Sequence, residues 1–292
     1  MADVYTYPNS LVLKNKFDER DQQQLDQREA DYTAVRVYEI QGGIATLPEP
    51  GFARLRAIHS YIFQDVYEWA GKPRITPLFK RHYVDHPLAT TFVDPSELHR
   101  EAERVFGRAA SANQFQNLSR SEFVEKAAEH FADINELHIF REGNGRAQRE
   151  YMRLLAVEAG HTIEFDGVSK ERMVAVSIAA SGIDRDLGPM CELFEEITHP
   201  GRAKALRKAA QFLETVKNEM QADWNEFHLA TVAQGIEYQG DFVVGNCEDF
   251  IFVTRNERNA VKAFYIGDAC DLPKGGLKWG QHVKFCATRS PG

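Results

Sequence analysis

A twelve-residue segment, residues 138–149 (HIFREGNGRAQR), contains side chains whose types and spacing suit phosphate chemistry. A neutral histidine accepts a proton from an incoming hydroxyl, so His138 is a candidate general base. A carboxylate beside bound phosphates suits Mg²⁺, so Glu142 is a candidate metal ligand. Arg146 and Arg149 are three residues apart, which places both on one face of a helix, where they can hold phosphates. The segment therefore predicts a phosphate site with its own proton acceptor.

Two glycines set the shape predicted for this segment. Gly143 and Gly145 flank Asn144, so the backbone can turn sharply and present its N–H groups at the start of a helix. The helix dipole favours an anion there. The alternative is an ordinary glycine turn between two packed helices, with solvated arginines and a structural histidine. We favour the phosphate site because every role is filled, in order, within one short loop.

The flanking sequence predicts a helix on each side of the segment. Ser119 and Glu122 form a capping-box pattern, and apolar residues then recur at helical spacing, which predicts a helix over residues 120–136. The apolar pattern resumes over residues 145–159 and stops at Gly160. The first helix is expected to deliver His138, and the second to carry both arginines.

Residues 138–149 resemble the signature of the Fic family, His-Pro-Phe-x-(Asp/Glu)-Gly-Asn-Gly-Arg-x-x-Arg. The usual reaction of that family transfers AMP from ATP to a hydroxyl of a target protein and releases pyrophosphate. The resemblance implies these roles: His138 as base, Phe140 as buried loop anchor, Glu142 as Mg²⁺ ligand, Gly143 and Gly145 as the anion nest, Asn144 beside the α-phosphate, Arg146 on the β-phosphate and Arg149 on the γ-phosphate.

Two positions bear on which reaction the resemblance implies. Ile139 replaces the usual proline, which removes a backbone constraint beside His138, so we expect a less rigid base rather than lost activity. Gly145 favours AMP transfer, since the relatives that act as kinases carry a lysine there. Kinase activity, transfer of UMP or of another phosphate-containing group, and a catalytically degenerate scaffold for protein interaction remain the alternatives.

An upstream stretch, residues 62–74, resembles the helix end and Trp-Ala-Gly corner that precede the flap of the family. Residues 73–91 are then expected to form a β-hairpin over the site. In the family such a flap docks the target by strand addition, and the residues expected to do so here are Ile75, Leu78, Phe79 and Lys80. The alternative is a loop whose apolar residues pack on the core.

The rest of the pattern predicts a mainly α fold: a Fic-type helical bundle with a β-hairpin flap, followed by a small OB-like β-barrel. Helices are expected near residues 20–40, 50–68, 95–110, 120–136, 145–159, 169–181 and 187–197. We place the catalytic domain at residues 1–200. A linker helix that leads away from the core, and then the barrel, take residues 201–292, with strands at 235–245, 249–255, 260–266 and 281–288.

Alternating aromatic residues in these strands have two interpretations. Phe250, Phe252 and Phe264 could bind single-stranded nucleic acid, but aromatics in alternating strands more often form a core, which we favour. The chain of 292 residues carries a formal charge of −8, which argues against duplex DNA as a partner. No stretch has the apolar length of a membrane helix, and the four cysteines lie far apart, as in a reducing compartment.

A Fic domain followed by a small barrel resembles the Bartonella effector proteins that type IV secretion injects into host cells. The resemblance implies synthesis in the bacterial cytoplasm, action on a host protein in the host cytoplasm, and a further C-terminal secretion domain. The inhibitory pattern Ser/Thr-x-x-x-Glu-Gly/Asn of many relatives is missing, and the nearest match ends in Met220. We therefore expect either an unregulated enzyme or a separate antitoxin-like chain that contacts Arg149.

Overall fold

The computed structural model describes residues 3–81, 89–182, 184–220, 227–254, 262–273 and 276–291. The chain separates into two compact units. The first runs to His161 and includes Ser181–Asp184, and the second comprises Thr162–Ala180 and the chain from Arg185 onward. The predicted boundary between the catalytic domain and the C-terminal domain, at residue 200, does not coincide with the boundary between these units. It stays a prediction.

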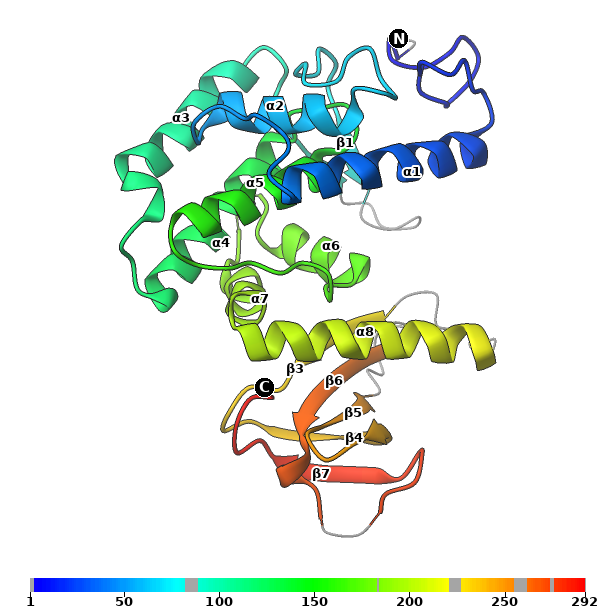
Figure 1. Cartoon of the computed structure of the whole chain (residues 1–292), viewed down its shortest axis with the longest axis vertical. Coiled ribbons are helices and arrows are strands. Elements are labelled where there is room, and N and C mark those ends of the chain that lie inside the picture. The colour runs from blue at the N-terminus through cyan, green and yellow to red at the C-terminus, as the bar shows by residue number, and fades with distance from the viewer. Residues whose placement is uncertain are drawn as a thin grey trace. The chain divides into compact units, whose positions relative to one another are not determined.

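The first unit is built from five α-helices and a short hairpin within its described residues (Figure 1). In chain order its elements are α1 (Gln22–Gln41), α2 (Phe52–Phe63), β1 (Phe79–Arg81), β2 (Ala89–Thr91), α3 (Leu98–Ser111), the 3₁₀ helix η1 (Asn113–Phe115), α4 (Arg120–Leu137) and α5 (Asn144–Glu158). These elements confirm the helices predicted for this part of the chain. α2 ends at Phe63, before the predicted residue 68, and the chain turns again at Gly71, whose φ is +75°.

Buried side chains of α2, α4 and α5 form much of the core of this unit. Ile58, Phe123, Ala127, Tyr151 and Leu155 are fully buried, at 0% exposure. They recur at the spacing that brings one face of each helix inward, as the apolar pattern predicted. Burying these faces fixes the two ends of the loop between α4 and α5.

In its described residues, the second unit combines three α-helices with a five-stranded mixed sheet. Its elements are α6 (Lys170–Ala179), α7 (Gly188–Thr198), α8 (Pro200–Met220), β3 (Phe227–Thr231), β4 (Glu237–Gly245), β5 (Asp249–Thr254), β6 (Lys262–Asp268), the 3₁₀ helix η2 (Ala269–Asp271) and β7 (His282–Cys286). The strand order is β3-β6-β5-β4-β7, in which β3 pairs with β6 in parallel and the other neighbours are antiparallel.

The sheet differs from the prediction in two respects. β3 was not predicted, and neither was its parallel pairing with β6. Among the strands that the structure describes, no ladder joins β3 to β7, so this sheet is open and closure into an OB-like barrel is not confirmed.

α8 was predicted as a linker helix that leads away from the core, but its apolar face is buried. Leu206 and Leu213 are at most 1% exposed, and α8 packs against α7, β3 and β6. The helix therefore belongs to the second unit. α7 ends at Thr198 and α8 begins at Pro200, where proline suits a first helical turn.

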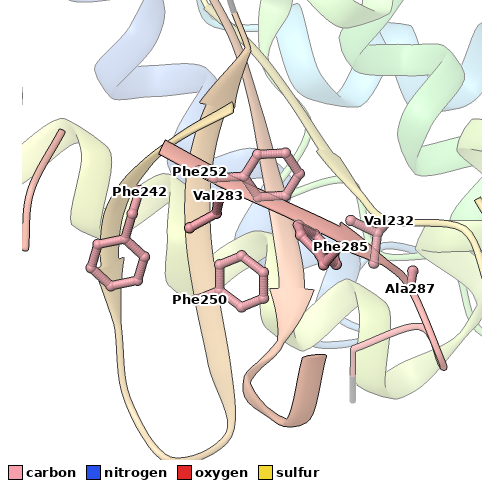
Figure 2. Packing of buried hydrophobic residues seen from close by; sticks show 7 residues of the cluster. All are labelled: Val232, Phe242, Phe250, Phe252, Val283, Phe285 and Ala287. Carbon is pink, nitrogen blue, oxygen red and sulfur yellow. The ribbon is translucent and has the colours of Figure 1, made fainter. Parts of the chain in front are cut away.

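Aromatic side chains pack together in a buried hydrophobic cluster formed by the sheet (Figure 2). Phe250 and Phe252 are at most 1% exposed, and the ring of Phe285 packs edge-to-face against them at interplanar angles of 70° and 86°. Phe264 is also 1% exposed, on the neighbouring strand β6. Rings buried in this way cannot stack on bases, so the interpretation of these phenylalanines as core residues is confirmed.

Candidate active site

His138 lies at the C-terminal end of α4, where the helix is stopped by a left-handed residue. The Ser119 and Glu122 capping box starts α4 as predicted, and His138 ends it with φ +44° and ψ +60°. The imidazole is 6% exposed and stacks on Phe92 at 3.9 Å between ring centroids. Phe92 directly follows β2, so the flap supplies the surface on which the candidate base rests.

Gly143 makes the turn into α5 possible. Its φ is +81°, and a Cβ atom at this position would lie 2.2 Å from the ring of Phe63. A side chain here is therefore excluded both by backbone strain and by the close approach of α2. Gly145 lies within α5 and is exposed, and a Cβ atom there would come within 3.3 Å of Nη1 of Arg149.

Asn144 stabilises the loop through its side chain. Its Oδ1 accepts a hydrogen bond from the Phe140 N–H at 2.9 Å, and its Nδ2 donates to the Phe140 carbonyl at 2.7 Å. The side chain is 4% exposed. These two hydrogen bonds hold the loop closed, and the place of Asn144 beside the α-phosphate stays a prediction.

Phe140 is 1% exposed, as expected of a loop anchor, and its partner is a residue that the sequence analysis missed. Its ring stacks on His59 of α2 at 3.8 Å. His59 Nδ1 accepts the Gly71 N–H, so the ring proton lies on Nε2, which donates to the Glu142 carbonyl at 2.9 Å. His59 therefore joins the loop to the Trp-Ala-Gly corner.

Arg74 is a second residue that the sequence analysis did not single out as functional. Its side chain is 1% exposed and donates to the carbonyls of His138 at 2.8 Å, Thr76 at 2.9 Å and Leu137 at 3.4 Å, and also to that of Val93. The two flap ends are thereby tied to the C-terminal carbonyls of α4, which favour a cation. Burial lowers the Arg74 pKa from its ordinary value.

Arg146 and Arg149 both project from α5, and contacts to α1 fix Arg146. Its guanidinium forms an ion pair with Glu29, donates to the Thr33 hydroxyl at 3.2 Å and lies 4.6 Å above the Phe63 ring centroid. Arg149 is half-buried one turn further along the helix. The structure thus places both predicted phosphate-binding arginines beside the start of α5.

Glu142 fits a metal site in which the protein supplies a single carboxylate. Its side chain is half-buried, and Oε1 accepts the Gly143 N–H at 2.8 Å. Within the described residues, no group of three or more His, Cys, Asp or Glu side chains could hold a metal ion by itself. Mg²⁺ commonly takes one or two carboxylates and completes its shell with substrate oxygens and water. Glu142 therefore suits an ion that binds together with phosphates.

The predicted flap is a β-hairpin. β1 and β2 pair antiparallel, with Phe79 opposite Thr91. Ile75 and Phe79 are 72% and 66% exposed, whereas Leu78 is half-buried. The side chain of Lys80 and residues 82–88 lie outside the described part of the chain. Two of the four predicted docking residues are therefore exposed apolar side chains at the base of the hairpin, rather than core residues.

Comparison with known proteins supports the relationship that the motif indicated. The Fic/DOC family model matches residues 52–156. A protein adenylyltransferase of Bartonella henselae is 31% identical over 98% of this chain and 52% of its own length. The solved structure of the type IV secretion system effector protein BepA is 31% identical, with a TM-score of 0.83 over 98% of this chain and 96% of that one. The chain belongs to the Fic/DOC family.

A further solved Fic structure contains a nucleotide. It is the N-terminal Fic domain of a putative cell filamentation protein from Bartonella quintana with bound ADP, 34% identical, with a TM-score of 0.60 over 71% of this chain and 97% of that one. The present Fic chain spans about half the length of the Bartonella henselae relative. Within its described residues, no helix has the length and apolar character needed to span a bilayer.

Because His59 is buried, we expect the free energy of unfolding of this Fic protein to depend on pH. Burial lowers the His59 pKa to about 3, from about 6.5 in an unfolded chain. Because the folded state favours the neutral ring, the stabilisation is present above pH 6.5 and is lost as pH falls toward 3. Between pH 7 and pH 5 we expect a loss of about 2 kcal/mol from this residue, measured by urea unfolding.

The contribution of His59 is isolated by comparing two variants. His59→Gln should lose about 2 kcal/mol less than the wild type between pH 7 and pH 5, whereas a variant of the exposed His99, His99→Gln, should follow the wild type. His130 and His228, whose pKa values burial lowers to about 4, contribute equally in all three proteins. An unchanged pH dependence in His59→Gln would contradict the assignment.

Proposed function

We propose that this chain is a protein adenylyltransferase that transfers AMP from ATP to a Ser, Thr or Tyr hydroxyl of a target protein, with release of pyrophosphate. The observation that carries the proposal is the position of His138 relative to Gly143 and the first turns of α5. A buried histidine ends α4, and a few residues later a left-handed glycine starts the helix that carries both arginines. The proposed base and the proposed phosphate site thus lie on either side of one short loop between α4 and α5.

The proposed chemistry needs one base and one anion site. The target hydroxyl oxygen attacks the α-phosphorus while its proton passes to His138. The bond from the α-phosphorus to the oxygen bridging it to the β-phosphate breaks, and pyrophosphate leaves. The backbone N–H groups at the start of α5, with Arg146 and Arg149, stabilise the charge that develops on the phosphates. Mg²⁺ held by Glu142 supplies further charge neutralisation when it is bound.

The flap is proposed to present the target segment. Ile75 and Phe79 are exposed apolar side chains at the start of the hairpin, and Phe92 after β2 contacts the base. A target strand that pairs with the hairpin edge would bring its hydroxyl toward His138. This supports a protein substrate over a small-molecule acceptor.

Three finer proposals concern delivery, inhibition and the second unit. We propose that the chain acts in a host cell after type IV secretion, because the similar protein BepA is a type IV secretion system effector. A small antitoxin-like chain is proposed to inhibit it at Arg149, because these 292 residues lack the inhibitory pattern Ser/Thr-x-x-x-Glu-Gly/Asn. The second unit is proposed to be an OB-like fold with a structural role, since its aromatic side chains are core residues.

The position of a radioactive label in ATP tests the proposed reaction. The chain is incubated with host-cell lysate and ATP labelled at either the α or the γ phosphate, beside a His138→Ala control. We expect protein to be labelled only from the α position, and only by the wild-type chain. Label from the γ position alone would identify a kinase. No label from either position, in a lysate that a related adenylyltransferase does label, would favour a scaffold.

A further inference from the structure

A carboxylate from α1 holds the first arginine of the motif. Glu29 forms the ion pair with Arg146, and Thr33, one turn further along α1, accepts a second hydrogen bond from the same guanidinium. The segment that matches the family model begins at residue 52, so α1 lies outside it. The contact therefore adds an element to the site that the motif does not contain.

Glu29 is itself held in place. The Tyr67 hydroxyl donates a hydrogen bond to its second carboxylate oxygen, and the Glu29 side chain is only 12% exposed. Burial and the nearby Glu29 carboxylate raise the pKa of Tyr67, so its hydroxyl stays protonated as the donor. Both oxygens of Glu29 are engaged, one by Arg146 and the other by Tyr67.

The guanidinium of Arg146 is consequently restrained on two sides. The Phe63 ring lies beneath it at 4.6 Å, while Glu29 and Thr33 engage its two terminal nitrogens. A guanidinium has five N–H donors, and these contacts use one on each terminal nitrogen. The other donors keep their directions fixed because the plane of the group is fixed.

We propose that Glu29, supported by Tyr67, is a positioning residue that orients Arg146 toward the phosphates of the nucleotide. The inference rests on the proposed function and extends it to α1. An arginine side chain loses much rotamer freedom when it binds a phosphate. If Glu29 has already ordered it, binding of the nucleotide costs less, which is the general effect of preorganisation.

The opposite role for Glu29 makes the opposite prediction. A carboxylate that competed with phosphate for Arg146 would weaken nucleotide binding, and its removal would strengthen it. The geometry favours positioning for two reasons. The Tyr67 hydroxyl donates a hydrogen bond to the Glu29 carboxylate, which stabilises its charge, and the Arg146 guanidinium has further N–H donors for a phosphate.

The same helix offers a matched control. Glu39 of α1 accepts hydrogen bonds from Arg36 at 2.8 Å and from the Tyr61 hydroxyl at 3.0 Å. The arrangement repeats that of Glu29 with an arginine and a tyrosine, but it contains no residue of the 138–149 loop. Glu39→Gln therefore measures the effect of losing such an ion pair on α1 alone.

Nucleotide binding and label transfer together test the proposal. Mg-ATP is titrated calorimetrically into Glu29→Gln and Glu39→Gln, each in a His138→Ala background that prevents turnover. We expect Glu29→Gln to weaken binding roughly 10-fold and Glu39→Gln to change it less than about 2-fold. With His138 intact, Glu29→Gln should lower the rate of transfer from α-labelled ATP at limiting ATP concentrations by a similar factor.

A double variant separates positioning from a general loss of structure. In an Arg146→Ala background, Glu29→Gln should change binding less than about 2-fold, because Glu29 acts through Arg146. The proposal would be wrong if Glu29→Gln lowered the affinity for Mg-ATP equally with and without Arg146, or if it raised that affinity. If Glu29→Gln bound Mg-ATP with wild-type affinity, the role proposed for Glu29 would be wrong but the proposed function would stand. If the wild-type chain bound no Mg-ATP, both proposals would be wrong.

Discussion

Replacing His138 by alanine should lower the rate of AMP transfer by about 10²–10⁴-fold, the usual contribution of a general base. The residue has no nearby substitute in the loop, where the other ionisable side chains are arginines and Glu142. Nucleotide binding should be nearly unchanged, because the phosphates are proposed to contact α5 and not the imidazole. The measurement is the initial rate of label incorporation at saturating ATP, together with the affinity for Mg-ATP.

Two further variants show that such a loss reflects chemistry rather than a disturbed loop. His138→Asn preserves the left-handed conformation, which asparagine tolerates well, but removes the basic imidazole. It should be as inactive as His138→Ala while unfolding at a higher temperature than His138→Ala, because the left-handed backbone is retained. His99→Ala, at an exposed histidine of α3, should retain full activity. A loss of less than about 10-fold in both His138 variants would rule out the proposed base.

Replacing Glu196 by alanine should destabilise the chain by about 3–5 kcal/mol, the usual cost of breaking a buried ion pair on one side. Glu196 and Arg172 are 4% and 5% exposed at their side chains and form a bidentate pair. Glu196 also accepts the Thr231 N–H at 2.9 Å, and Arg172 donates to the Leu229 carbonyl at 3.0 Å. The pair thus satisfies backbone groups of β3, a strand at the edge of the sheet.

Urea unfolding monitored by circular dichroism measures this loss against a control on the same helix. Glu192 is exposed, so Glu192→Ala should change the free energy of unfolding by no more than about 0.5 kcal/mol. The double variant Glu196→Ala with Arg172→Met should lose less than the two single variants together, because neither buried charge is then left unpaired. A loss below about 1 kcal/mol in Glu196→Ala would contradict the assigned role.

The sequence predicted features whose causes are local. A capping box acts over three residues, and an apolar face repeats every three or four, so α4 and α5 could be placed from spacing alone. The need for glycine at residue 143 could also be predicted, because a sharp turn was required there. Strand β3 could not be predicted in this way. The backbone groups at its outer edge form hydrogen bonds with Arg172 and Glu196, which come from helices distant in the sequence.

From its sequence alone, this protein could be assigned its motif, its mainly helical class and its candidate base, since these depend on neighbouring residues. Only the tertiary structure could show that His59, Arg74 and Glu29 complete the site. Their partners Glu142, His138 and Arg146 lie 83, 64 and 117 residues away along the chain. No local pattern encodes such contacts, because packing α1, α2 and the flap against the loop brings these residues together.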